Sequence, residues 1–133
     1  MKNIKDQVNL KDKIVLLRLD LNVPLLDRVI TDETRIDKII PIINFLLNNK
    51  AKILILSHVG RPKGKKNSEL SLKPICLNLE KKINKKIKLI STNLYDLRKN
   101  KLFLDKNEDV NFLENIRFYK EEEINDIKFA KHL

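Results

Sequence analysis

The chain lacks the features that mark membrane and secreted proteins. None of its 133 residues belongs to an uninterrupted apolar run that approaches the roughly 18 residues of a membrane helix. The N-terminus, MKNIKDQVNL, has no apolar stretch of the kind found in a secretory signal. We therefore expect no membrane partner and a cytoplasmic location.

Cysteine and glycine are also scarce. Cys76 is the only cysteine, which excludes an intramolecular disulfide and argues against a cysteine-based metal site. Leucine and isoleucine surround it at helical spacing, so we predict that Cys76 is a core residue. Gly60 and Gly64 are the only glycines, too few for a glycine-rich phosphate loop. The sequence therefore predicts neither a metal site nor a nucleotide-binding loop of this kind.

Acidic residues are in the minority. The chain has 28 lysines and arginines against 18 aspartates and glutamates, and its net charge of +10 favours a nucleic acid or another anionic partner. Lysine far outnumbers arginine, however, and Asn and Ile are abundant, which is the pattern of AT-rich codon usage. Aromatic residues do not interleave with the basic runs at 63–66 and 81–88, so no base-stacking platform is evident. We do not expect a nucleic-acid partner.

Hydrophobic residues, at 42% of the chain, are sufficient for one core. Residues 14–19 form an apolar run interrupted only by Arg18, which is the pattern of a strand buried on both faces. Polar turn chemistry follows at residues 20–27.

The first helix is predicted at residues 35–49, where apolar side chains recur at helical spacing. Thr31 and Asp32, just upstream, are available as N-caps. Pro41 lies inside the pattern and removes one backbone hydrogen bond. We expect it to kink the helix or to start it afresh.

The same alternation of strand and helix patterns continues through the rest of the chain. A second helix is expected to start at the cap Ser71, with Pro74 tolerated in its first turn. Residues 93–109 are expected to mix a short helix with loop, and residues 125–133 to open another helix. The remaining strands are predicted at residues 52–57, 86–90 and 110–113.

Strands that alternate with helices predict strand-helix-strand units joined by right-handed crossovers. Such units build a mostly parallel sheet with helices on both faces. We therefore predict an α/β fold, a Rossmann-like three-layer sandwich, in one domain over residues 1–133. No internal repeat or flexible linker divides the chain.

Polar residues follow three of the four predicted strands. Because ligands of open parallel sheets bind beyond the carboxyl ends of the strands, these residues are expected to meet at one edge. Taken singly, each could be a surface charge or a structural hydrogen-bonding group. The candidates are Asp20 and Asn22 after the first strand, His58 and Arg61 after the second, and Arg117 after the fourth.

Arg35 is a further candidate, because a cation in the first turn of a helix opposes the positive end of the helix dipole. Local rules are most often broken at functional sites, although a solvated arginine would explain it equally well. Arginines grouped with a histidine would form a cradle for phosphate or carboxylate.

Five motifs then carry a family resemblance, in this order along the chain: RLDLNVPL at 18–25, ITDETRI at 30–36, SHVGRPKG at 57–64, SLKP at 71–74 and LENIRFYKEEE at 113–123. Together they resemble the N-terminal domain of phosphoglycerate kinase over essentially the whole chain. The family implies reversible phosphoryl transfer between 1,3-bisphosphoglycerate and ADP, giving 3-phosphoglycerate and ATP.

The resemblance also implies a role for each candidate residue. Asp20 and Asn22 would hold the hydroxyl and carboxylate end of the phosphoglycerate. Arg35 would bind substrate and face the transferring phosphoryl group, where a cation compensates the charge of the transition state. The distal phosphate would be held by His58, Arg61 and Arg117.

Two departures from the family pattern stand out. Leu21 occupies a position where the family usually has phenylalanine. Family members are also much longer, with a second domain that binds Mg-ATP or Mg-ADP and that has no counterpart here. We therefore expect a partial N-terminal substrate-binding domain whose sheet is incomplete at its C-terminal end. This partial domain should bind no cofactor and should be inactive alone. The resemblance also implies a monomer, because family members are usually monomeric.

Two alternatives stay open at this point. The chain could be a degenerate remnant that acts as a basic module for RNA or another polyanion. Retention of all six candidate residues argues against that alternative, because generic polyanion binding does not require them. A separately encoded nucleotide-binding half would reveal itself as activity only on mixing.

Overall fold

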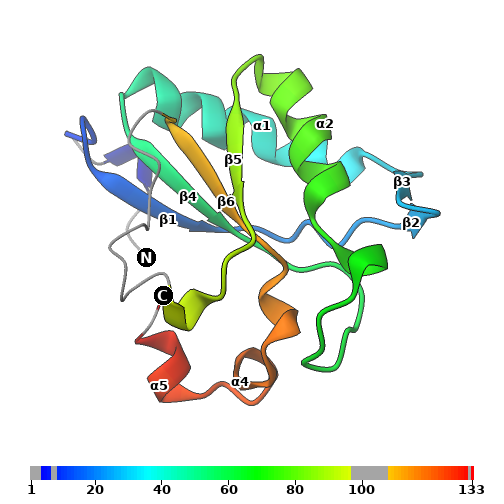
Figure 1. The fold of residues 1–133 in the computed structure, drawn as a ribbon. Helices are drawn as coiled ribbons and strands as arrows, with labels where there is room; N and C mark the ends of the chain where they lie inside the picture. The colour runs from blue at the N-terminus through cyan, green and yellow to red at the C-terminus, as the bar shows by residue number, and fades with distance from the viewer. Residues whose placement is uncertain (1–3, 7–8, 97–107, 132) are drawn as a thin grey trace.

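The computed structural model describes residues 4–6, 9–96, 108–131 and 133 (Figure 1). Four parallel strands form the main sheet: β1 (Ile14–Arg18), β4 (Lys52–Leu56), β5 (Ile87–Ile90) and β6 (Val110–Leu113). Their spatial order is β1-β4-β6-β5. Leu16 is level with Leu54, and Ile55 is level with Phe112. The fold is therefore α/β and Rossmann-like, as predicted, and the strand bounds agree closely with those expected.

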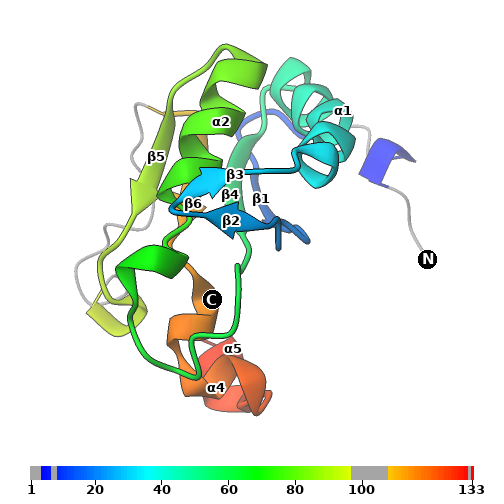
Figure 2. The same cartoon turned by 90° about the vertical axis from the view of Figure 1, so that its right-hand side faces the viewer.

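The two long helices, α1 (Thr34–Asn48) and α2 (Lys73–Ile83), pack together on one face of the sheet (Figure 2). We call this the helical face. Its core consists of alternate strand residues, exemplified by Ile53, Ile55 and Phe112, beneath apolar residues of both helices. Burial of this interface supplies the main hydrophobic stabilisation of the described residues.

The opposite face of the sheet, here called the second face, is covered by shorter elements. Leu54, Leu56 and Leu113 are buried there against Leu94 and Phe129. Phe129 belongs to the short helix α5 (Ile127–Ala130), and the rings of Tyr95 and Tyr119 pack around it in edge and tilted contacts. Helical residues therefore lie on both sides of the sheet.

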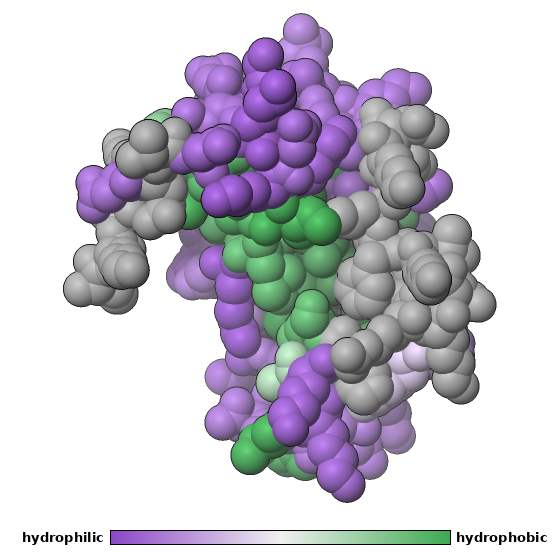
Figure 3. Space-filling view, turned by 90° about the vertical axis from the view of Figure 1, so that its left-hand side faces the viewer, coloured by the Kyte–Doolittle hydropathy of each residue, from purple (hydrophilic) through white to green (hydrophobic). Residues whose placement is uncertain are grey.

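The prediction that the first strand is buried on both faces was wrong. In β1, Val15 and Leu17 pack on the helical face, whereas Ile14 and Leu16 on the second face are 62% and 49% exposed. The reason is position, because β1 forms an edge of the sheet and no described residue covers its second face. Figure 3, which views the molecule from the β1 side, shows an apolar area there.

Helix α1 runs through Pro41 without starting afresh. Pro41 is exposed, while Ile36, Ile43 and Leu46 are fully buried, so packing holds the helix together across the missing hydrogen bond. The predicted caps were also misplaced. The N-cap residue is Glu33, which makes no side-chain cap bond, although Oδ1 of Asp32 accepts from the Thr34 N–H at 2.8 Å.

Helix α2 starts two residues after the predicted cap. Leu72 is the N-cap residue, and the hydroxyl of Ser71 still accepts from the Lys73 N–H at 3.2 Å. Pro74 lies in the first turn, as expected. Cys76 is buried in the core, and burial raises the pKa of its thiol to about 12, which makes it unreactive near neutral pH.

Sequence patterns missed several small elements. Strands β2 (Leu25–Leu26) and β3 (Val29–Ile30) form a hairpin beside α2 (Figure 2), and the polar turn predicted at residues 20–27 overlaps only β2. Helix α4 (Lys120–Glu123) precedes α5, the helix expected within 125–133. Of the mixed segment predicted at 93–109, residues 94–96 are helical, and residues 97–107 lie outside the described part. Among the described residues, no helix is both long enough and apolar enough to cross a bilayer.

Candidate functional site

The loops that follow β1, β4 and β6 meet at one end of the sheet, and a buried serine joins them. Ser57, directly after β4, donates from Oγ to the Leu19 carbonyl at 2.8 Å and accepts from the Leu21 N–H at 3.1 Å. The backbone carbonyl of Ser57 accepts from the Ile116 N–H at 3.2 Å. One buried residue, through its side chain and its backbone, thus links all three strand ends.

A second buried polar residue, Asn115, anchors the long loop between β4 and α2. Its Nδ2 donates to the carbonyls of Val59 and Leu70, both at 2.8 Å, and the side chain is fully buried. Its Oδ1 accepts from the Arg117 N–H at 3.1 Å. The same amide therefore fixes the loop that carries His58 and the backbone that carries Arg117.

The structure brings Asp20, Asn22 and Arg35 together. Nη1 of Arg35 forms an ion pair with Oδ2 of Asp20, and Oδ1 of Asp20 accepts from the Asn22 N–H at 3.3 Å. Oδ1 of Asn22 accepts from the Gly60 N–H at 2.9 Å, which links this group to the loop after β4. Arg35, in the first turn of α1, thus has an ionic partner and is not simply solvated. Both members of the ion pair are largely exposed, so the pair adds little stability.

The pKa of Asp20 lies below its ordinary value. Desolvation is the largest single influence and raises it, but hydrogen bonds from the Asn22 amide and from Arg35, with the charge of Arg35, together lower it. Asp20 is therefore a carboxylate at neutral pH, able to accept a hydrogen bond from a hydroxyl group.

Arg117 lies close to a carboxylate that the sequence patterns did not single out. Its Nε is 3.4 Å from Oε2 of Glu122, and Nη2 of Arg18 is 2.6 Å from Oε1 of the same side chain. Glu122 is only 8% exposed at its side chain. Two guanidinium groups therefore share one sheltered carboxylate. The signal that was available is Arg18 itself, the one cation inside an otherwise apolar strand.

His58 is partly buried near this cluster. Burial, and then the positive charge of Arg117, lower the pKa of its imidazole below 6.5, while Glu122 and Asp20 oppose the shift. His58 is thus neutral near pH 7 and offers one ring nitrogen as a donor and the other as an acceptor.

Arg61 is the least engaged of the six predicted residues. It lies on the loop after His58, is exposed, and makes no hydrogen bond or ion pair within the described residues. The loop itself is tightly placed, because Gly60 has a φ of 63° and a Cβ there would lie 2.6 Å from Cδ2 of Leu70. Gly64, with a φ of 69°, donates to the Arg117 carbonyl at 3.2 Å.

We call the six predicted residues, with Arg18 and Glu122, the anion edge. The anion edge contains four guanidinium groups and two carboxylates, which leaves an excess of positive charge; three of the guanidinium groups pair with these carboxylates. Planar guanidinium groups bind carboxylate and phosphate through paired hydrogen bonds. No group of three or more His, Cys, Asp or Glu side chains within the described residues could hold a metal ion. The hydrogen-bond donors of this edge suit an organic anion.

Comparison with known proteins gives a consistent result. The sequence profile of the phosphoglycerate kinase family matches residues 4–133. Phosphoglycerate kinase of Prochlorococcus marinus (strain MIT 9515) is 46% identical over 129 residues, which cover 96% of this chain and 32% of that protein. The enzyme of Borreliella afzelii (strain PKo) is 44% identical over 133 residues, covering 100% of this chain and 34% of that protein.

Solved structures agree with the sequences. Phosphoglycerate kinase from Coxiella burnetii superimposes with a TM-score of 0.83 at 37% identity, covering 97% of this chain and 31% of that one. The enzyme from Pyrococcus horikoshii gives 0.75 at 30% identity, covering 92% and 29%. The chain thus spans about a third of the length of the relatives it matches. The chain belongs to the phosphoglycerate kinase family.

Proposed function

We propose that these 133 residues form the phosphoglycerate-binding part of a phosphoglycerate kinase. The reaction is the reversible transfer of a phosphoryl group between 1,3-bisphosphoglycerate and ADP, giving 3-phosphoglycerate and ATP. The observation that carries the proposal is the anion edge, where hydrogen bonds join the loops after the strands. Ion pairs there join Arg35 to Asp20 and Arg117 to Glu122.

The charges of the anion edge fit the two ends of a phosphoglycerate. Asp20 and Asn22 offer acceptors and an amide to the hydroxyl and carboxylate end, beside the guanidinium group of Arg35. His58, Arg61 and Arg117 offer donors to the distal phosphate. Each guanidinium group that leaves its carboxylate for the ligand exchanges one charged partner for another, so the cost of separating the ion pair is offset.

Arg35 is the residue we assign to catalysis. In phosphoryl transfer, negative charge spreads over the equatorial oxygens of the moving group, and a fixed cation beside them lowers the barrier. Arg35 extends from the first turn of α1 and is about half exposed, so its guanidinium group is accessible to a second substrate. The nucleotide, as Mg-ATP or Mg-ADP, would be bound by the second domain of full-length family members, which these residues do not include.

Calorimetric titration with 3-phosphoglycerate tests the binding role. We expect one molecule to bind per chain and Arg35→Ala and Arg61→Ala each to weaken it, because each removes a cation from the anion edge. Lys88→Ala is the matched control, since Lys88 is an exposed cation on β5. An equal loss in all three variants would mean that only net charge matters.

Competition with an oligonucleotide tests the alternative of a basic RNA-binding module. We expect the oligonucleotide to bind weakly and not to displace 3-phosphoglycerate at physiological salt. Tight oligonucleotide binding that Arg35→Ala and Arg61→Ala leave unchanged would contradict the kinase interpretation.

A turnover assay addresses the reaction itself. We expect the 133 residues alone to show no ATP formation, because transfer needs a bound nucleotide in line with the acyl phosphate. Activity that appears only after a nucleotide-binding half is added would support the proposal. Robust turnover by the purified chain would refute the assignment of this half-site.

A further inference from the structure

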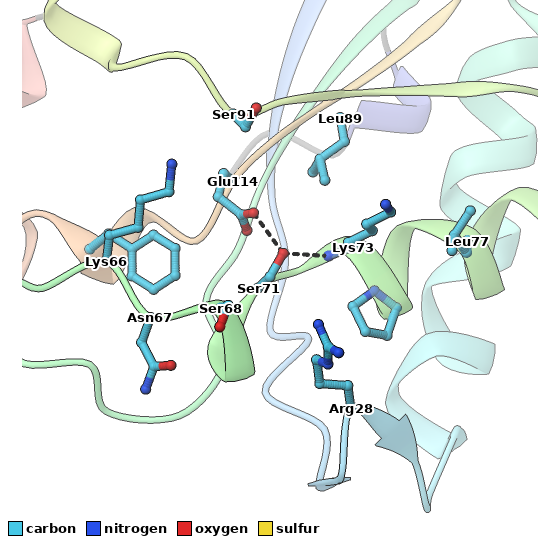
Figure 4. A pocket seen from close by; sticks show the side chains of 12 residues that line it. Arg28, Lys66, Asn67, Ser68, Ser71, Lys73, Leu77, Leu89, Ser91 and Glu114 are labelled. Carbon is cyan, nitrogen blue, oxygen red and sulfur yellow. Dashed lines mark hydrogen bonds between the residues drawn. The ribbon is translucent and has the colours of Figure 1, made fainter.

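A cavity of about 910 Å³ lies beside the start of α2, at the carboxyl ends of β5 and β6 (Figure 4). None of the residues of the anion edge lines it. Its volume falls within the range of roughly 300–1,000 Å³ that is usual for small-molecule sites. The phosphoglycerate-binding function proposed above leaves this cavity without a role.

Part of the cavity wall is apolar. Pro74 and Leu77 come from α2, Leu89 from β5, and Phe118 from the segment after β6. Leu77 is 48% exposed, whereas Leu79, the other leucine of the same helix, is fully buried. Covering such surfaces is favourable by about 25 cal/mol per Å² of apolar area removed from water. The wall therefore suits a ligand with an apolar body.

The one carboxylate in the cavity already has its hydrogen-bond partners. Oε2 of Glu114 accepts from the Ser71 hydroxyl at 2.7 Å, the contact drawn in Figure 4. Oε1 accepts from the Leu72 N–H at 2.7 Å and the Asn115 N–H at 2.9 Å. Glu114 thus accepts hydrogen bonds at the start of α2. Its negative charge would repel the anionic group of a ligand, so that group would lie away from Glu114.

Three cationic side chains also line the cavity, and Figure 4 shows them on different sides of it. Neither Lys66 nor Lys73 has an ionic partner among the described residues. Arg28 has only a long contact of 3.8 Å with the exposed Glu69. It sits at the tip of the β2–β3 hairpin, where Asp27 and Arg28 have φ angles of 48° and 63°. Such a turn favours Gly or Asn, so an arginine is held here against local preference.

We propose that this cavity binds one small organic anion that has an apolar body and a single sulfonate, carboxylate or phosphate group. The apolar body lies against the apolar part of the wall, and the positive charge of the lining residues Arg28, Lys66 and Lys73 attracts the anionic group. The site is independent of the phosphoglycerate-binding function and does not rest on it.

Fluorescence titration with anilinonaphthalene sulfonate tests both parts of the site, and the uncharged phenylnaphthylamine serves as the probe without the anion. We expect one sulfonate probe per chain. Replacing both Arg28 and Lys66 by glutamine should weaken the sulfonate probe about tenfold and leave the neutral probe unchanged. Leu77→Gln should weaken both probes.

The chain offers matched controls for each substitution. Lys65→Gln replaces an exposed lysine next to Lys66, and Lys65 does not line the cavity. Leu26→Gln replaces a leucine that is 66% exposed and does not line the cavity either. Both should bind like the unaltered chain, and circular dichroism should confirm that every variant is folded.

Two results would overturn the proposal. Loss of binding in Leu16→Gln but not in Leu77→Gln would place the probe on the exposed side of β1. Full displacement of the sulfonate probe by 3-phosphoglycerate would place it at the anion edge. Binding that survives saturating 3-phosphoglycerate and fails only in the cavity variants is the expected result, whether or not 3-phosphoglycerate itself binds.

Discussion

Two borders of the same sheet differ sharply in this molecule. The anion edge, at the carboxyl ends of the strands, is polar and cross-linked by the buried side chains of Ser57 and Asn115. The lateral edge along β1 is apolar on its second face, where Ile14 and Leu16 are exposed and no described strand pairs with it (Figure 3).

The two borders therefore differ in what holds their side chains in place. At the anion edge, buried polar groups have partners within hydrogen-bonding distance, and unsatisfied ones would be costly. At the lateral edge, the side chains of Leu16 and Ile14 need no hydrogen-bond partners, so their exposure leaves no polar group unsatisfied. It does leave apolar surface in contact with water, which favours association. Substitutions should therefore affect folding and binding at the first border and association at the second.

The largest effect is expected from Asn115→Ala. It leaves the carbonyls of Val59 and Leu70 without their donor inside the core, at a cost of about 3 kcal/mol in the free energy of unfolding. Urea unfolding measures the loss. Asn44→Ala, at an exposed position of α1, is the control and should change stability little. Equal stability of the two variants would mean that Asn115 does not organise the anion edge.

Arg117→Ala should act on binding more than on folding. Removing its guanidinium group should weaken 3-phosphoglycerate binding by about 2 kcal/mol, or roughly thirtyfold, because a charge-assisted hydrogen bond is lost. Calorimetry measures the affinity. Arg28→Ala, which removes an arginine remote from the anion edge, should leave the affinity unchanged. An equal loss of affinity in the two variants would show that only the net charge of the chain affects binding.

At the lateral edge, Leu16→Thr should change stability by no more than about 0.5 kcal/mol, because Leu16 is 49% exposed. It should instead reduce self-association, which we expect for the unaltered chain once salt screens its charge of +10. Sedimentation velocity at low and high salt measures this. Leu26→Thr is the control, and an equal reduction there would show that β1 is not the contact surface.

The smallest effect should come from His58 and should depend on pH. Its folded pKa is lowered below 6.5 by burial, so the unfolded chain binds the proton more readily. Stability should therefore fall as pH decreases through 6.5, and His58→Gln should flatten that part of the curve. Thermal unfolding between pH 5 and pH 8 measures it, with Asn44→Gln, at an exposed position without an ionisable group, as the control that keeps the slope. A slope that persists in His58→Gln would assign it to other groups.

Particular residues show how far sequence patterns reached. The strand at 110–113 was predicted with the bounds of β6, and the helical stripe of α2 with its buried Cys76, because both depend on a local period. The two-residue strands β2 and β3 were not predicted, since two residues cannot display a period. The carboxylates that form ion pairs with the predicted arginines were not predicted either. Glu122 is distant in sequence from Arg18, and only the fold brings them together.

Local patterns are enough to predict the α/β order of elements and the polar residues that follow the strand ends, because periodicity and turn chemistry act between near neighbours in the chain. The place of β1 at the border of the sheet, with one face exposed, depends instead on how the strands assemble. The same holds for the ion pair of Asp20 with Arg35 and for the cavity that is lined by residues from the hairpin, helix and strand. These features depend on contacts between segments far apart in the chain, which no local pattern encodes.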